Sequence, residues 1–206
     1  MFGFIEKIDI DLFYLVNMAG RNLFLDILMP FMSNLNNFII PIAIFVLWMI
    51  FKKSSKTRTI AVMILLLIAA TEFITSDVLK PIFKRPRPYH SLSKFHHYNR
   101  VHKRWDMKGI LEKKLVGRSQ SMPSAHASNT FAAAIFLSFY FRKFWPLFYG
   151  VAFLVGYSRV YLGVHYPFDV LAGAVTGSVT GILFIFLSNK AINLFGKKQE
   201  ASGQNA

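Results

Sequence analysis

The chain has 206 residues, a formal net charge of +14 and a hydrophobic content of 54%, with 22 phenylalanines. So high an apolar content excludes an ordinary soluble domain and predicts a membrane protein. The length allows one domain, and the positive charge favours anionic partners such as lipid headgroups, nucleic acid or phosphate-bearing molecules. Because there is no cysteine, disulfides, thiolate nucleophiles and thiolate metal sites are excluded.

The N-terminal apolar stretches are short for a membrane crossing. Residues 4–19 alternate apolar and acidic positions, which is typical of an amphipathic helix on a membrane surface. Residues 22–33 contain Pro30 and fit an interfacial helix, a re-entrant piece or the first half of a bent span. Residues 37–51 form the first clear apolar run, which needs the contribution of 22–33 to complete a crossing.

Further apolar runs predict membrane-spanning helices at 59–79, 124–141, 144–158 and 168–188, followed by a polar, frayed tail. The chain is therefore predicted to be an all-α integral membrane protein with a bundle of about six transmembrane helices. On the last run, Gly173, Gly177 and Gly181 share one helical face and allow close approach of another backbone. That backbone belongs to a dimer partner or, as we expect, to another helix of the same bundle.

Counting crossings places two polar segments on one membrane face. The segment 80–122 follows the 59–79 span, and two more spans return the chain to the same side at 159–167. Side chains from both segments can therefore meet at the helix mouths on that face.

Combined with the charges of the loops, the same count predicts which membrane face lies outside, although the loops on both faces are basic. Twelve of the 24 Lys and Arg residues lie between Lys80 and Arg118, which by the positive-inside rule favours the cytoplasm. The short loop 52–58, the turn at 142–143 and the C-terminal lysines are also basic and lie on the opposite face. We assign part of the 80–118 charge to ligand binding, so the short loops predict that the 80–122 face is extracellular or periplasmic.

Lys80 and Arg87 stand at the end of the 59–79 span, in a segment stiffened by prolines at 81, 86 and 88. A basic anchor at the membrane interface would explain them, and so would an anion site. Four histidines follow at positions 90, 96, 97 and 102. Their spacing fits no zinc pattern, so we expect solvated loop histidines and no metal.

Two further motifs precede helices. Ser124 is a candidate N-cap, and a helix N-terminus with unpaired N–H groups binds anions, while His126 in the first turn can donate a proton. Asp169 lies four residues after His165, so its carboxylate can fix the ring tautomer and leave the other nitrogen as a base or nucleophile. Arg159 offers a planar fork of donors. Simple capping and a structural Arg–Asp–His cluster are the alternatives.

Together these motifs read Lys-x6-Arg-Pro, Pro-Ser-x-His and Ser-Arg-x5-His-x3-Asp, and they resemble the three signatures of the type 2 phosphatidic acid phosphatase superfamily. The resemblance covers about residues 60–185, the expected catalytic core of a single domain 1–206 with short N-terminal helices in 1–36 and a tail in 190–206. Within that family, the layout is similar to bacterial phosphatidylglycerophosphate phosphatases of the B type. Ala125 stands where the family usually has glycine.

The resemblance implies a role for each residue. Lys80, Arg87 and Arg159 would hold the phosphate oxygens, with Ser124, Ala125 and backbone N–H groups beside them. His165 would attack phosphorus, Asp169 would orient it, and His126 would protonate the leaving oxygen and later activate water. No cofactor is implied, since lysine and arginine supply the positive charge.

The expected activity is dephosphorylation of phosphatidylglycerol phosphate by a multi-pass protein of the cell membrane. The alternatives are hydrolysis of undecaprenyl pyrophosphate, broad activity on phosphatidic acid or diacylglycerol pyrophosphate, and binding of anionic lipid without turnover. The expected partners are a lipid phosphate and the bilayer, and not nucleic acid.

Overall fold

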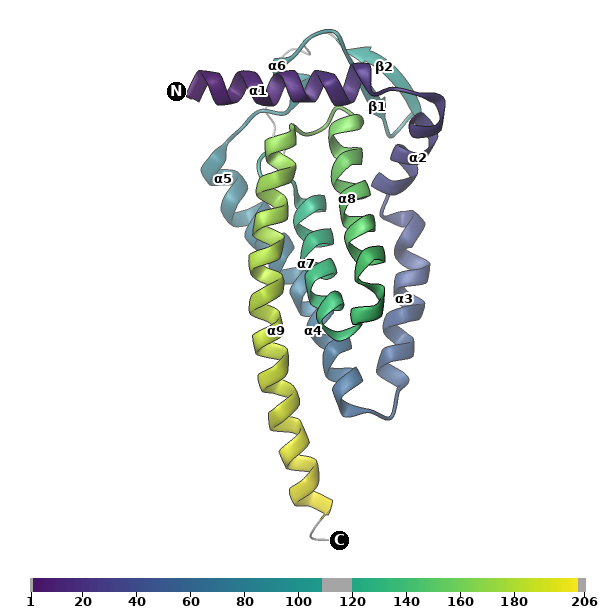
Figure 1. The fold of residues 1–206 in the computed structure, drawn as a ribbon, viewed down its shortest axis with the longest axis vertical. Helices are drawn as coiled ribbons and strands as arrows, with labels where there is room; N and C mark the ends of the chain where they lie inside the picture. Colours follow the sequence, from purple (N-terminus) through teal and green to yellow (C-terminus); the bar gives the residue numbers. More distant parts are fainter. Residues whose placement is uncertain (1, 109–119, 204–206) are drawn as a thin grey trace.

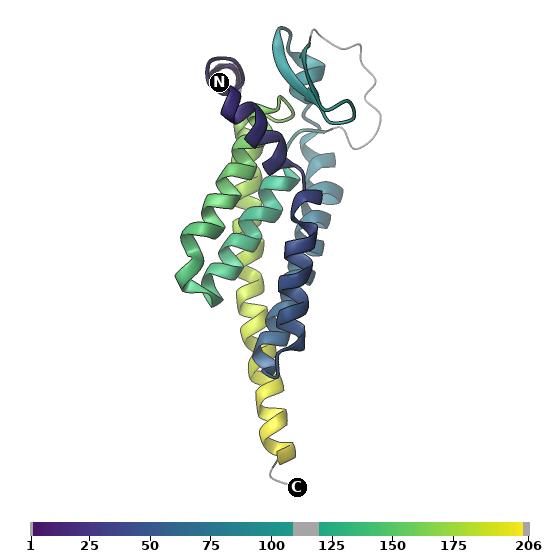
Figure 2. The same cartoon turned by 90° about the vertical axis from the view of Figure 1, so that its right-hand side faces the viewer.

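A computed structural model describes residues 2–108 and 120–203. In this part of the chain the fold is an elongated helical bundle with a small β-hairpin at one end (Figures 1 and 2). The predicted helical membrane architecture is thus confirmed in outline. The hairpin is a departure from the all-α prediction.

The N-terminal helices take two directions. Helix α1 (Phe2–Tyr14) continues through a π-helical turn (Leu15–Ala19) and lies across the end of the bundle (Figure 1). The chain then bends by 117° into α2 (Leu23–Ser33), whose first turn is capped by the Asn22 side chain. Helix α3 (Asn36–Phe51) follows α2 along the side of the bundle (Figure 1). The path of α1 is the one that a helix at the membrane surface would take.

Within residues 2–108 and 120–203, two helical stretches are long and apolar enough to cross a membrane. One is Ser55–Ser91, which comprises α4 (Ser55–Phe73), a π-helical stretch (Ile74–Leu79), α5 (Lys80–Phe83) and α6 (Pro88–Ser91). The other is Pro167–Leu194 in α9 (Pro167–Gly203), and the bent pair α1–α2 would make a third span. Helices α7 (Ala125–Tyr140) and α8 (Trp145–Tyr161) have 16 and 17 residues, short for a span of about 20. The predicted count of about six spans therefore stays a prediction.

Part of the predicted polar segment is ordered. Strand β1 (Phe95–Asn99) pairs antiparallel with β2 (Arg104–Lys108), and the Tyr98 amide donates to the Leu162 carbonyl at the end of α8. Gly163 there has φ +73°, and a Cβ on it would lie 2.6 Å from the His96 carbonyl oxygen. His96 and His97 are half-buried in β1, so the expectation of solvated loop histidines is wrong for these two. Residues 109–119 lie outside the described part of the chain.

Helices α7 and α9 pack closely along the glycine face. A Cβ on Gly177 would lie 2.1 Å from the Ser128 carbonyl oxygen, and one on Gly173 would lie 2.5 Å from that of Ser124. The prediction that this face packs within the bundle is confirmed. Helix α9 also continues to Gly203, past the predicted end at 188, because residues 189–203 contain no proline and several good helix formers.

Candidate active site

The three motif segments meet at the end of the bundle that carries α1 and the hairpin (Figure 1). The Ser124 amide donates to the Asp169 carbonyl at 2.9 Å, and the Ser121 amide donates to the Arg85 carbonyl at 2.7 Å. These backbone bonds join the segment before α7 to the start of α9 and to the proline-rich turn. The single face expected from counting crossings is therefore observed.

His165 and Asp169 form the buried centre of the site. His165 is 2% exposed and Asp169 is fully buried, and His165 Nδ1 lies 3.6 Å from Asp169 Oδ2. The Ser121 hydroxyl donates to Asp169 Oδ2 and lies 3.4 Å from His165 Nδ1, so it stands beside both groups. The Tyr166 amide also donates to Asp169 Oδ2, at 2.8 Å. These contacts occupy Nδ1 and leave Nε2 as the ring nitrogen that can react with a substrate.

Burial keeps the His165 ring neutral. Burial, opposed by the contact with Asp169 and assisted by the charges of Arg87 and Arg159, lowers the pKa of His165 to about 3. An unprotonated imidazole near neutral pH is the form that can attack an electrophile.

Arg85, which sequence reasoning missed, neutralises the buried Asp169. Its Nη1 donates to Asp169 Oδ1 at 2.8 Å, and its Nη2 lies 2.6 Å from Oδ2 of the fully buried Asp9. Its guanidinium also stacks over the Tyr166 ring at 4.1 Å. Asp9 in turn accepts from the Phe168 amide at 2.9 Å, so α1 is bonded to the start of α9.

Arg159 does not pair with Asp169, as a structural Arg–Asp–His cluster would require. It is 4% exposed, and its Nη1 donates to the hydroxyl of Ser33 at the end of α2. Arg159 Nε and Ser124 Oγ are both buried and have no hydrogen-bond partner among the described residues. Unpaired buried polar atoms of this kind suit a bound anion.

Ser124 is at the N-cap of α7, as predicted, but its side chain does not cap the helix. The first intrahelical bond runs from the Ser128 amide to the Ser124 carbonyl, so the amides of Ala125, His126 and Ala127 precede it. Ala125 is buried at 8% exposure. These three amides are the donors that this helix end offers to an anion.

The remaining predicted cations, Lys80 and Arg87, lie near the two histidines. Lys80 is buried, with Nζ 3.5 Å from the Ser76 hydroxyl, and Arg87 lies near the Tyr89 ring. The charges of Arg159, Arg100 and Lys80 act on the His126 ring. The positive charges of Arg87 and Arg159 affect the protonation of His165. The predicted cations and both histidines therefore share one electrostatic environment. Among residues 2–108 and 120–203, no group of three His, Cys, Asp or Glu side chains is arranged to hold a metal ion.

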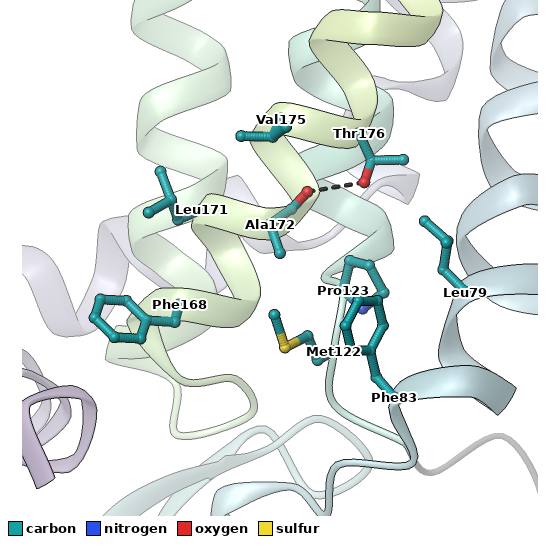
Figure 3. Close-up of a pocket in the computed structure, with 9 residues that line it drawn as sticks. All are labelled: Leu79, Phe83, Met122, Pro123, Phe168, Leu171, Ala172, Val175 and Thr176. Carbon is teal, nitrogen blue, oxygen red and sulfur yellow. Dashed lines mark hydrogen bonds between the residues drawn. The ribbon is translucent and has the colours of Figure 1, made fainter. Parts of the chain in front are cut away.

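An apolar groove of about 530 Å³ adjoins this site (Figure 3). It lies between the end of the α4–α5 stretch and the first turns of α9. Its lining includes Pro123 and Phe168, the direct neighbours of Ser124 and Asp169. The other lining residues are Leu79, Phe83, Met122, Leu171, Ala172, Val175 and Thr176.

Comparison with known proteins identifies one family. The family model of the PAP2 superfamily matches residues 61–192. The lipid A 4'-phosphatase of Bacteroides thetaiotaomicron is 47% identical over 76 residues, 36% of this chain and 34% of that protein. The undecaprenyl-diphosphatase of Sulfolobus acidocaldarius is 31% identical over 179 residues, 86% of this chain and 77% of that protein.

A solved structure agrees in fold. The crystal structure of a transmembrane PAP2 type phosphatidylglycerolphosphate phosphatase from Bacillus subtilis is similar with a TM-score of 0.64 and 25% identity. The match covers 90% of this chain and 87% of that one. By contrast, the match to the Bacteroides protein spans only about a third of that protein's length.

Proposed function

Because the chain belongs to the PAP2 superfamily, we propose that it is an integral membrane phosphatase of lipid phosphates. The observation that carries this proposal is the pairing of the buried, neutral His165 with Asp169, next to a buried Arg159 whose Nε has no partner among the described residues. A nucleophilic ring and an unsatisfied cationic donor together fit attack on a phosphate.

The proposed reaction has two steps. His165 Nε2 bonds to phosphorus while the phosphorus–oxygen bond to the lipid breaks, and His126 gives a proton to the departing oxygen. Water, deprotonated by His126, then attacks the phosphohistidine and releases phosphate, which restores both rings. Lys80, Arg87 and Arg159, with the first amides of α7, stabilise the charge on the equatorial oxygens. Asp169 stabilises the positive charge that develops on His165.

The groove beside Pro123 and Phe168 supports a lipid substrate. Its lining is almost wholly apolar, so an acyl or isoprenoid chain can lie in it while the phosphate reaches the cations. We propose phosphatidylglycerol phosphate as the preferred substrate, supported by the similarity in fold to the Bacillus subtilis phosphatase. Undecaprenyl diphosphate is the second candidate, because a relative that matches 86% of this chain bears the name undecaprenyl-diphosphatase.

The test is phosphate release by the purified protein from phosphatidylglycerol phosphate, phosphatidic acid and undecaprenyl diphosphate. Wild type is expected to act with the highest kcat/KM on phosphatidylglycerol phosphate, with or without excess EDTA, and His165→Ala is expected to be inactive. Lipid binding without turnover by wild type would favour the non-enzymatic alternative. A loss of activity in EDTA that magnesium restores would exclude a metal-free mechanism.

A further inference from the structure

Arg100, which belongs to none of the three motifs, shares a hydrogen-bond acceptor with Arg159. It follows strand β1, and its Nη2 donates to the carbonyl oxygen of Ser33 at 2.6 Å and to the Ser33 hydroxyl at 2.7 Å. The same hydroxyl accepts from Nη1 of Arg159. One fully buried serine at the end of α2 therefore holds two guanidinium groups side by side.

This pair of like charges is not neutralised within the described part of the chain. There, Ser33 is the only residue to which the side chains of Arg100 and Arg159 are hydrogen-bonded, and no carboxylate forms an ion pair with either. Two cations that share one acceptor repel each other, and because Arg159 is buried, water screens this repulsion less than at an open surface. A bound anion removes this repulsion, and the buried Nε of Arg159 is a donor available to it.

Arg100 stands beside Arg159, because both donate to the Ser33 hydroxyl, and its side chain is solvent-exposed whereas Arg159 is buried. The positive charges of both arginines act on His126. Under the proposed function, His126 protonates the leaving oxygen, so Arg100 is near the part of the substrate that departs. Lys80, Arg87 and Arg159 already supply three positive charges, enough for one phosphate of about −2. Arg100 is a fourth charge, beyond what one phosphate needs.

We infer that Arg100 is a substrate-binding residue that holds a second phosphate group, on the leaving-group side of the one that is cleaved. This inference rests on the proposed function and narrows its substrate class to lipids with two phosphate groups. The second group is either bonded directly to the first, as in an isoprenoid diphosphate, or joined through glycerol, as in phosphatidylglycerol phosphate. Phosphatidic acid has one phosphate and makes no contact with Arg100.

The test compares substrates within each variant of the full-length protein in detergent micelles. Arg100→Ala is expected to lower kcat/KM about 10- to 100-fold for undecaprenyl diphosphate, phosphatidylglycerol phosphate or both, the loss of one charge-assisted hydrogen bond. Activity on phosphatidic acid should change less than about threefold, within the scatter of a surface substitution. Whichever two-phosphate substrate is affected identifies the source of the second phosphate.

Two variants serve as controls. Arg104→Ala removes a cation of the same hairpin that is 68% exposed and paired with Asp106, and all three activities should stay unchanged. Arg100→Lys keeps the charge but loses the fork of donors. Its kcat/KM on the two-phosphate substrates should therefore lie between those of wild type and Arg100→Ala. The ratio of two-phosphate to phosphatidic acid activity does not depend on the fraction of folded protein. An unchanged ratio in both Arg100 variants would overturn the inference and leave the phosphatase proposal intact.

A binding measurement separates the two proposals. By calorimetry, inorganic pyrophosphate is expected to bind wild type more tightly than orthophosphate, and this preference should disappear in Arg100→Ala. Wild type that releases no phosphate from any lipid would refute the phosphatase proposal. Equal affinity of wild type for the two inorganic anions would refute a directly bonded second phosphate at Arg100, and the glycerol-linked phosphate would then be decided by the ratio of phosphatidylglycerol phosphate to phosphatidic acid activity in Arg100→Ala.

Discussion

At the scale of single residues, the site depends on the geometry of its arginines as well as on their charge. Arg159 is held by Ser33 through one terminal nitrogen and keeps its Nε for a ligand, an arrangement that only a guanidinium provides. Lysine at this position has its three N–H donors on a single nitrogen, so it cannot reach Ser33 and the phosphate from two separate nitrogens as the guanidinium does.

The first prediction follows from this geometry. Arg159→Lys and Arg87→Lys should each lower kcat/KM by about 30- to 1000-fold, the equivalent of about 2–4 kcal/mol of transition-state stabilisation. Lys103→Ala and Arg104→Ala, on the exposed hairpin, should have little effect. Steady-state kinetics measure kcat/KM. Near wild-type values for both lysine variants would show that Arg87 and Arg159 do not hold the phosphate through their guanidinium forks.

The second prediction concerns His165 and pH. Because burial lowers its pKa to about 3, its ring should stay neutral on acidification from pH 7 through its ordinary value of 6.5. The unfolded chain binds that proton first, so the contribution of His165 to stability should be lost as pH falls below 6.5 toward 3.

Nitrogen-15 NMR of labelled histidine, with His165→Gln to assign the signal, measures the titration. Thermal unfolding at several pH values measures the stability, which should fall less steeply for His165→Gln than for wild type. A His165 titration centred near pH 6.5 in the folded protein would contradict the prediction.

At the scale of elements, α1 is attached to the catalytic end of the bundle through Asp9. Its carboxylate bonds the Phe168 amide and Arg85, and Arg85 bonds Asp169. Asp9→Ala leaves the partly buried Phe168 amide and one end of the partly buried Arg85 guanidinium without an acceptor. We expect a loss of about 2–4 kcal/mol of stability, with reduced activity. Asp11→Ala, at an exposed position of the same helix, is the matched control, and equal melting temperatures for the two variants would contradict this role.

The contact between α7 and α9 gives a second prediction at this scale. Gly177→Ala places a methyl group against the Ser128 carbonyl, so the helices must separate, at a cost of about 1–3 kcal/mol. Gly150→Ala in α8 meets nothing within 4 Å and should be neutral or slightly stabilising. Thermal unfolding in micelles compares them, and similar melting temperatures would mean that the α7–α9 contact is not tight in solution.

At the scale of the whole molecule, the prediction concerns orientation. The turns at 52–54 and 142–144 lie at the end of the bundle opposite the hairpin (Figures 1 and 2). The chain has no cysteine, so single cysteines can be introduced without background. In intact cells, Val101→Cys in the hairpin turn should react with an impermeant thiol reagent, while Ser55→Cys and Lys143→Cys should not. The reverse pattern would place the site in the cytoplasm.

The sequence alone determined which family the chain resembles and that its motif segments share one end of the molecule. Lys80, Arg87, His126, His165 and Asp169 could be singled out because each motif is a short local pattern, and their catalytic roles stay a proposal. Counting apolar runs then placed those segments together, and the glycine face of α9 was assigned to the bundle by its spacing of four residues. Each of these features can be read within a few helical turns.

Only the tertiary structure decided which groups hold these residues. The distant partners of Asp169 proved to be Ser121 and Arg85, 48 and 84 positions away, and that of Arg159 proved to be Ser33, 126 positions away. Arg85 is in turn held by Asp9 in α1. A contact over such distances leaves no periodic pattern, and an aspartate in α1 or a serine at the end of α2 is ordinary in composition. Arg100 reached the site for the same reason, because the hairpin that carries it docks on the Leu162 carbonyl through tertiary hydrogen bonds.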